Sequence, residues 1–94
     1  MVIDRGRGQV WRGDRLLSLT PTEFRLLTCL ARHPGQALTR AQLLDAVWGY
    51  DAEVQSERVV NVHIRRLREK VELDPGRPTL ILTVPGIGYR LSDS

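Results

Sequence analysis

Residues 58–71 read RVVNVHIRRLREKV, and this stretch shows a strong helical periodicity. When successive residues are placed about 100° apart around a helix, four apolar side chains fall within about 40° of one another: Val60, Ile64, Leu67 and Val71. This stripe is expected to hold the segment against a hydrophobic core. The pattern therefore predicts a helix from about residue 56 to residue 73.

The opposite side of this predicted helix is basic, with valines among the arginines. It carries Arg58, Val59, Val62, Arg65, Arg66 and Glu69. A basic helix face is most often a solvated face. Exposed valine is unusual on such a face, because it has low helix propensity and gains nothing from contact with water. DNA explains both residue types, since guanine and phosphates attract arginine while the thymine methyl group offers an apolar contact.

The position of each side chain on this face divides the expected contacts with DNA. Arg66 lies near the centre and is the candidate for reading a base edge. The residues that flank the centre are expected to hold phosphates; they are Arg58, His63, Arg65 and Arg68. His63 has an equal alternative interpretation as a boundary histidine whose ring is satisfied within the fold.

Outward from this segment, two capping boxes predict two further helices. Thr20 with Glu23, and Thr39 with Gln42, have the spacing of a threonine cap and a side chain that bonds back to it. Gly49 is expected to stop the second of these helices.

Short apolar runs precede and follow the helices. Residues 2–19 contain runs separated by glycine and charge, with a two-residue hairpin turn expected at Gly13-Asp14. Residues 79–91 are expected to form two strands joined by a glycine-containing turn. The order predicts an α+β fold of one domain over residues 1–94. It is a winged helix-turn-helix with an N-terminal antiparallel sheet at 2–19, a three-helix core at 20–73 and a C-terminal β-hairpin wing at 79–91.

Length and composition agree with one small domain. The 94 residues include 41% hydrophobic and 27% charged side chains, which is typical of a chain that folds around one core. Its net charge of +3 fits a polyanionic partner only if the charge is concentrated on one face. The single cysteine, Cys29, is interpreted as a core residue, and it excludes an internal disulfide. No apolar stretch approaches the about 20 residues that span a bilayer, so a cytoplasmic protein without membrane contact is expected.

The pattern contains nothing typical of an enzyme. The two histidines lie far apart, and no residues have the spacing of metal ligands. We therefore expect no catalysis, no cofactor and no metal. The alternative function is a winged-helix module for protein interaction without DNA readout. RNA binding is a further option, which an aromatic content of 5% disfavours.

Several motifs together resemble the effector domains of the OmpR/PhoB family of response regulators. They are LTPTEF at 19–24, LTR at 38–40, VWG at 47–49, VNVHIRRLREK at 60–70 and GIGY at 86–89. The resemblance extends from about Ile3 to Leu91. It implies a winged helix with a four-stranded N-terminal sheet, and transcription regulation by binding double-stranded DNA at direct-repeat half-sites beside a second copy of itself. It also implies a receiver domain N-terminal to the effector domain.

The resemblance also implies site residues. It implies DNA contacts at Trp48, Arg58, His63, Arg65, Arg66, Arg68 and Tyr89. The helix pattern described above adds Val62 to the expected DNA-binding residues. Trp48 and Tyr89 are equally well explained as packing residues, because aromatic rings bury large areas. The loop after the second helix, with Tyr50, Asp51 and Glu53, is implied to contact RNA polymerase, and a plain connector is the alternative.

Three positions depart from the family pattern. Val59 stands where threonine is common and cannot donate a hydrogen bond to phosphate. Asn61 stands where aspartate is common and removes a negative charge near the DNA. Pro85 replaces a wing arginine and can neither place a cation in the minor groove nor donate from its backbone. A weak contribution of the wing to recognition is therefore expected.

Overall fold

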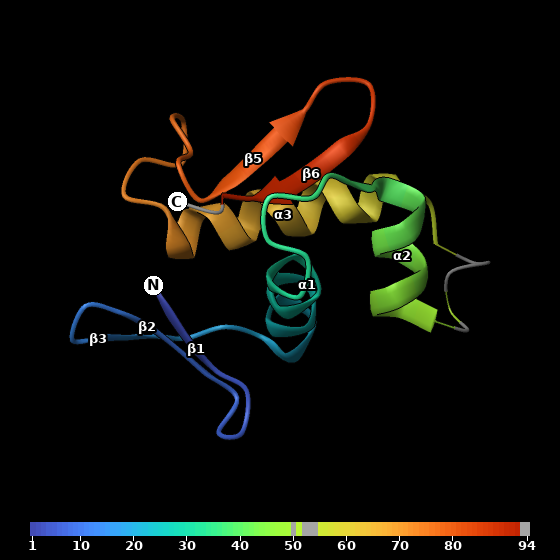
Figure 1. Ribbon diagram of the computed structural model, residues 1–94. Coiled ribbons are helices and arrows are strands. Elements are labelled where there is room, and N and C mark those ends of the chain that lie inside the picture. Colours follow the sequence, from blue (N-terminus) through green and yellow to red (C-terminus); the bar gives the residue numbers. More distant parts are fainter. Residues whose placement is uncertain (50, 52–54, 93–94) are drawn as a thin grey trace.

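The computed structural model describes residues 1–49, 51 and 55–92. Their elements, in chain order, are β1 (Val2–Asp4), β2 (Gln9–Arg12), β3 (Arg15–Leu17), α1 (Pro21–Ala31), β4 (Leu38–Thr39), α2 (Arg40–Trp48), α3 (Arg58–Val71), β5 (Ile81–Val84) and β6 (Gly88–Leu91). Figure 1 shows the helices between the N-terminal strands and the β5-β6 hairpin. This order is that of the predicted winged helix-turn-helix.

The N-terminal sheet is antiparallel, in the order β1-β2-β3. The β2-β3 hairpin turns at the predicted place, with Arg12 paired to Arg15 and Gly13 at a φ of 61°. The described residues form three strands of this sheet, one fewer than the resemblance implied. Ser18 to Thr20 leave the sheet because Thr20 becomes the N-cap of α1, and its backbone N–H donates to the Glu23 carboxylate at 2.9 Å.

Both predicted capping boxes are confirmed. The Thr20 side chain accepts from the Glu23 N–H at 3.2 Å, and the Thr39 side chain accepts from the Gln42 N–H at 3.0 Å. The reciprocal bond from the Thr39 N–H to the Gln42 side chain is 2.8 Å long. Each box satisfies N–H groups that a helix start leaves unpaired, so both starts are fixed locally. The second helix ends at Gly49, as predicted.

The third helix is shorter than the predicted range of 56–73. It begins after Glu57, which makes no side-chain capping bond, and it ends at Glu72, whose backbone is extended. The chain leaves the helix there because the Glu72 carboxylate accepts backbone N–H groups of the segment that enters β5, from Thr79, Leu80 and Ile81.

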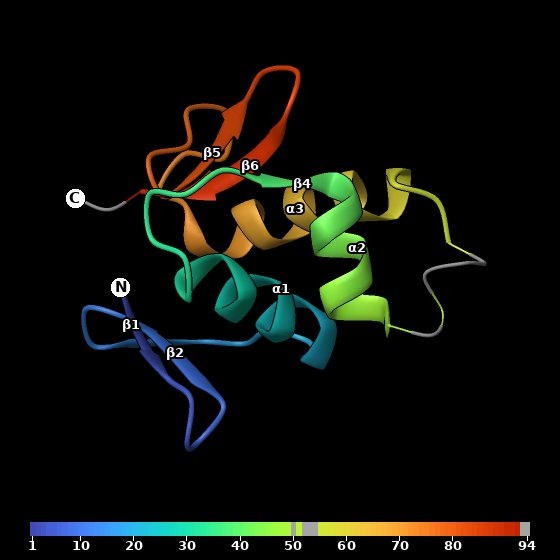
Figure 2. The same cartoon turned by 45° about the vertical axis from the view of Figure 1, so that its right-hand side comes forward.

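The C-terminal hairpin is part of a second sheet, in the order β4-β6-β5. The two-residue strand β4 was not predicted; it pairs Leu38 with Tyr89 and Thr39 with Gly88. A Cβ atom at Gly88 would overlap the Leu38 carbonyl, so the close approach of β4 and β6 requires glycine. Figure 2 shows β4 beside β6 and leading directly into α2. The wing is thereby joined to the start of α2.

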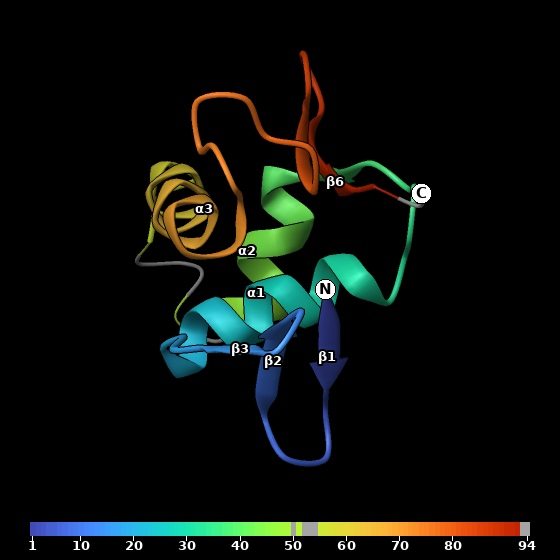
Figure 3. The same ribbon diagram turned by 90° about the vertical axis from the view of Figure 1, so that its left-hand side faces the viewer.

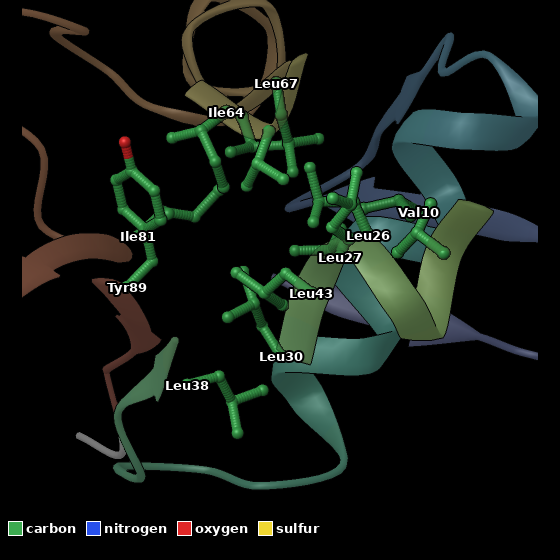
Figure 4. Close-up of a cluster of buried hydrophobic side chains, with 14 residues drawn as sticks. Val10, Leu26, Leu27, Leu30, Leu38, Leu43, Ile64, Leu67, Ile81 and Tyr89 are labelled. Atoms are coloured by element: carbon green, nitrogen blue, oxygen red, sulfur yellow. The ribbon is translucent and has the colours of Figure 1, made fainter. Parts of the chain in front are cut away.

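The core lies between the helices and the inner side of this second sheet. Figure 4 shows Ile64 and Leu67 of α3 between wing residues on one side and leucines of α1 on the other. The predicted stripe of α3 is confirmed, with Val60, Ile64, Leu67 and Val71 exposed by 1% or less. Cys29 is half-buried and packs against the core, and burial raises the pKa of its thiol. Among the described residues, no helix is long and apolar enough to cross a membrane.

Candidate nucleic-acid interface

The outer face of α3 carries four exposed side chains that share one side of the helix. They are Arg58, Val62, Arg65 and Arg66, at spacings of three and four residues. Val62 is 45% exposed. Figure 3 looks along α3 and shows one side of the helix at the edge of the molecule, away from the other elements. The predicted separation of an apolar inner face from a basic outer face is present in the structure.

The cations of this face are available to a partner. Arg65 lies 3.7 Å from Glu69, with side chains that are 85% and 58% exposed. Such a pair is screened by water and contributes little, so the guanidinium can rebind elsewhere at small cost. In the part of the chain that the structure describes, Arg58 and Arg66 make no hydrogen bond or ion pair. Three positive charges therefore face solvent around one exposed valine.

Val59 does not belong to this outer face, contrary to the prediction. It is half-buried and packs against the core, because it lies at the margin of the face beside the fully buried Val60. Its departure from threonine therefore adds an apolar contact inside the protein, and Val62 is the valine that faces outward.

His63 and Trp48 form one unit at the edge of the outer face. Their rings meet edge to face, with centroids 5.1 Å apart. The His63 Nδ1 lies 2.8 Å from the Val59 carbonyl. Since a carbonyl only accepts, the ring carries a proton on Nδ1. One ring nitrogen is thus satisfied within the fold, and Nε2 makes no hydrogen bond to any residue that the structure describes.

Asn61 joins α3 to both α2 and the wing. Its Oδ1 accepts from Arg40 Nε at 2.8 Å and from the Tyr89 hydroxyl at 2.7 Å. The Arg40 guanidinium carbon also lies 5.2 Å from the Tyr89 ring centroid, and Tyr89 is only 6% exposed. Tyr89 therefore packs and bonds inside the domain, and its hydroxyl is already engaged by Asn61.

Arg40 is a member of this network that the sequence pattern did not single out. It is the first residue of α2, where the helix dipole disfavours a cation. A cation at such a position signals a compensating partner, which here is the Asn61 oxygen together with the Tyr89 ring.

Arg68 turns toward the wing and away from the outer face. Its Nε and Nη2 donate to the Ile81 carbonyl at 3.1 and 2.9 Å, and Nη2 also donates to Thr83 Oγ1 at 2.9 Å. Its guanidinium carbon lies 5.4 Å from the Tyr89 ring centroid. The structure thus brings Arg68 and Tyr89 together, but apart from the three outward arginines.

The wing turn is short and carries no cation. Gly86 has a φ of 75°, and Ile87 is 47% exposed. Arg90, on β6, is half-buried. Pro85 is exposed beside Gly86, so the tip of the turn presents apolar atoms and backbone.

The predicted polymerase-contact loop lies largely outside the described residues. Tyr50 and Glu53 are not described, and Asp51 is exposed with its carbonyl accepting from the Gln55 N–H at 3.1 Å.

The rear of α3 is fixed to α1 by an ion pair between the partly exposed Lys70 and the buried Glu23. Lys70 Nζ lies 2.6 Å from Glu23 Oε1, and Glu23 is 2% exposed. Burial alone would raise the pKa of Glu23. The hydrogen bonds from Lys70 and from the Thr20 N–H outweigh it, so the net pKa lies below its ordinary value.

The arrangement has close relatives among known proteins. Residues 13–91 match the family model described as "Transcriptional regulatory protein, C terminal". The DNA-binding response regulator MtrA of Mycobacterium tuberculosis is 52% identical over 88 residues, which are 94% of this chain and 38% of MtrA. The transcriptional regulatory protein AfsQ1 of Streptomyces coelicolor is 53% identical over 91 residues, which are 97% of this chain and 40% of AfsQ1. The chain thus spans only about two fifths of these relatives.

Solved structures share the fold. The DNA-binding domain of Klebsiella pneumoniae RstA, determined in complex with the RstA box, superimposes with a TM-score of 0.87 at 34% identity, covering 98% of this chain and 90% of that domain. On these matches in sequence and fold, the chain belongs to the family of transcriptional regulatory protein C-terminal domains, as an effector domain of the OmpR/PhoB type.

Proposed function

We propose that this domain regulates transcription by binding double-stranded DNA in a sequence-specific manner, with α3 in the major groove. The observation that carries the proposal is the outer face of α3, where Arg58, Arg65 and Arg66 face solvent around Val62 while the opposite stripe is buried. An α-helix fits the major groove, which is about 12 Å wide. RstA, whose domain has the same fold, was solved bound to DNA.

The four side chains have distinct proposed roles. Arg66, near the centre of the face, donates to guanine, and Val62 contacts a thymine methyl group. Arg58 and Arg65 hold phosphates on either side, joined by His63 through its Nε2. Trp48 supports His63 from behind, through the contact of their rings.

The wing contributes less than α3. A turn that carries proline in place of a cation offers no charge to the minor groove, where narrow segments attract arginine. Sequence readout should therefore be concentrated in the major groove. A complex in which residues 84–88 lie deep in the minor groove would contradict this.

The parts of the relatives that this chain does not match motivate the proposed partners. MtrA is a response regulator in which the matched region is 38% of the protein. We propose that the present domain works together with an N-terminal receiver domain, and that two copies bind direct-repeat half-sites. RNA polymerase contact through the loop at Asp51 is part of the same proposal.

The test begins with a duplex selected from a random pool by the domain itself. Fluorescence anisotropy then gives the affinity for this duplex and for a scrambled one at several salt concentrations. Tight binding should fall steeply with salt, with a slope of about 0.9 per phosphate contact, and should exceed binding to the scrambled duplex. No preference and no salt dependence would refute DNA readout and favour the protein-interaction module.

Two variants locate the readout. Arg66→Ala should cost about 1–3 kcal/mol on the selected duplex and relax its base preference, whereas Arg65→Ala should weaken both duplexes equally. Arg5→Ala is the matched control, because Arg5 is an exposed arginine near the β1-β2 turn. It removes the same charge from the far end of the chain. If Arg66→Ala lowered both affinities by the same factor, the assignment of Arg66 to a base would be wrong.

A further inference from the structure

Within the described part of the chain, the strand β5 has one edge without a strand neighbour. The sheet order β4-β6-β5 places β6 on its other side. The Ser92 N–H donates to the Leu80 carbonyl at 2.7 Å, so Leu80 bonds across the hairpin. In an antiparallel pair, the next residue along the strand points its N–H and C=O to the opposite side. Ile81 therefore presents both backbone groups at the open edge.

Arg68 of α3 and the C-cap residue Glu72 occupy this edge and satisfy both backbone groups of Ile81. The Glu72 Oε2 accepts from the Ile81 N–H at 2.8 Å, while Arg68 donates twice to the Ile81 carbonyl, at 3.1 and 2.9 Å. Arg68 also donates to Thr83 Oγ1 at 2.9 Å, one pleat further along the strand. The Glu72 carboxylate accepts from the backbone N–H, and the Arg68 guanidinium donates to the backbone carbonyl. The end of α3 therefore makes the hydrogen bonds that a neighbouring strand would otherwise make.

This junction fixes the wing relative to the recognition surface. Ile81 is fully buried and Glu72 is 4% exposed, so neither group can exchange its partner for water without opening the junction. Without the arginine, the buried Ile81 carbonyl would have no hydrogen-bond donor. The free energy lost by leaving a buried acceptor unsatisfied is larger than the free energy that an exposed hydrogen bond contributes. The bonds therefore restrain the hinge between α3 and β5.

We propose that Arg68 is a positioning residue, which sets the angle between the wing and α3, and that it is not a phosphate ligand. The proposal replaces the phosphate contact that the family resemblance implies, and its consequence for DNA rests on the proposed function. Nε and Nη2 of Arg68 are engaged by β5. Arg65 is 85% exposed, and its one ion pair with a described residue is the 3.7 Å contact with Glu69. Two arginines three residues apart on one helix thus have different roles.

Lysine at position 68 distinguishes the two roles. A phosphate contact accepts lysine, because a point charge still binds phosphate. The junction does not, because a single ammonium group cannot reproduce the planar fork that reaches Ile81 and Thr83 together. Thr83→Val is a milder second variant, since it removes one of the bonds at an exposed position and keeps a β-branched side chain.

The first experiment uses the free domain and measures amide hydrogen exchange by NMR. In Arg68→Lys, the amides of residues 81–84 should exchange about tenfold faster, and in Thr83→Val the same amides should shift in the same direction by less. The matched control is Arg65→Lys, which makes the same chemical change on the outer face and should leave exchange at 81–84 within twofold of the parent. Equal exchange in Arg68→Lys and Arg65→Lys would overturn the proposal.

The second experiment maps the wing on DNA. Iron-EDTA is tethered at Ile87→Cys in a Cys29→Ser background, and cleavage of the pool-selected duplex is read at saturating protein. In Arg68→Lys the cleaved stretch should widen about twofold, because the wing samples more angles. If Arg68 only stabilised the fold, Arg68→Lys would lower the affinity for DNA, and at saturating protein the cleavage pattern would match that of the parent.

The outcomes separate the two proposals. One outcome refutes the positioning role and makes Arg68 a phosphate ligand. Arg68→Ala would lower the salt dependence of DNA binding as much as Arg65→Ala does, and amide exchange at residues 81–84 would be unchanged in Arg68→Lys. If the parent domain selects no duplex, the proposed function fails. The exchange experiment still decides whether Arg68 holds the wing.

Discussion

Lys70→Met removes the cation that pairs with the buried Glu23 carboxylate and so tests how α3 is held against α1. The Lys70 Nζ lies 2.6 Å from Glu23 Oε1, and the carboxyl keeps a second bond from the Thr20 N–H at 2.9 Å. Methionine preserves most of the aliphatic stem, so the change is mainly electrostatic. Its cost measures what the pair contributes to folding.

The magnitude follows from the exposure of the two partners. A hydrogen bond to a charged group contributes about 1.5–3 kcal/mol. The Lys70 side chain is 37% exposed, so solvent screens part of this and we expect about 1–2 kcal/mol. For a domain of this size each kcal/mol lowers Tm by about 4–8 °C. Thermal denaturation followed by circular dichroism measures the difference directly.

The pH dependence has a definite sign. The pKa of folded Glu23 lies below its ordinary value of 4.5, so the pair stabilises the fold fully above that pH. This stabilisation is lost as the pH falls through the lowered pKa of the folded state. The Tm difference between the parent and Lys70→Met should therefore be constant at neutral pH and shrink in acid. An equal difference at pH values well above and well below that pKa would refute the electrostatic explanation.

A double-mutant cycle is the control. Glu23→Gln keeps an oxygen that can accept the Thr20 N–H but removes the charge that binds Lys70. If the losses from Glu23→Gln and Lys70→Met simply add in the double variant, the two groups are not coupled and the reasoning fails.

Three further changes test other parts of the structure. Gly88→Ala should cost at least about 1–3 kcal/mol, because the new methyl group meets the Leu38 backbone; urea denaturation measures it, and a neutral result would mean that β4 is not held against β6. Leu67→Ala, which opens a cavity at a fully buried position, should cost about 2–5 kcal/mol in the same assay, and a loss under about 1 kcal/mol would place Leu67 outside the core. Asn61→Asp should raise Tm slightly, because its oxygen then accepts from Arg40 as an anion, while weakening binding to a random-sequence duplex; tighter binding would contradict the placement of Asn61 near phosphates.

Local spacing predicted the parts of the fold that local chemistry decides. The capping boxes at Thr20 and Thr39 and the buried stripe that includes Ile64 each depend on residues three or four positions apart, and all are present. Strand β4 could not be found in this way. Its two residues, Leu38 and Thr39, have no pattern of their own and form a strand only because β6, distant in sequence, lies beside them.

The residues of the candidate site can likewise be separated into those that local spacing predicts and those that depend on distant parts of the chain. Periodicity placed Arg58, Val62, Arg65 and Arg66 on an exposed face, because that placement depends only on the helix and its buried stripe. It could not tell that Val59 turns inward or that Arg68 bonds to β5. Those outcomes depend on the neighbours that the fold supplies at the margins of the helix.

The remaining polar side chains of α3, together with Glu72 at its C-cap, explain why so few residues are left for DNA. Other elements engage four of them: Asn61 bonds to α2 and the wing, Arg68 and Glu72 bond to β5, and Lys70 bonds to α1. His63 uses Nδ1 for a backbone carbonyl and keeps Nε2 for phosphate. These contacts surround the helix on the sides and rear and fix its orientation without using the outer face. With no cation at the wing tip, Arg66 and Val62 must then carry most of the discrimination between sequences. Exchanging Arg66 or Val62 should therefore change which sequence is bound, whereas exchanging the phosphate-binding arginines or the residues that hold α3 should change how tightly any sequence is bound.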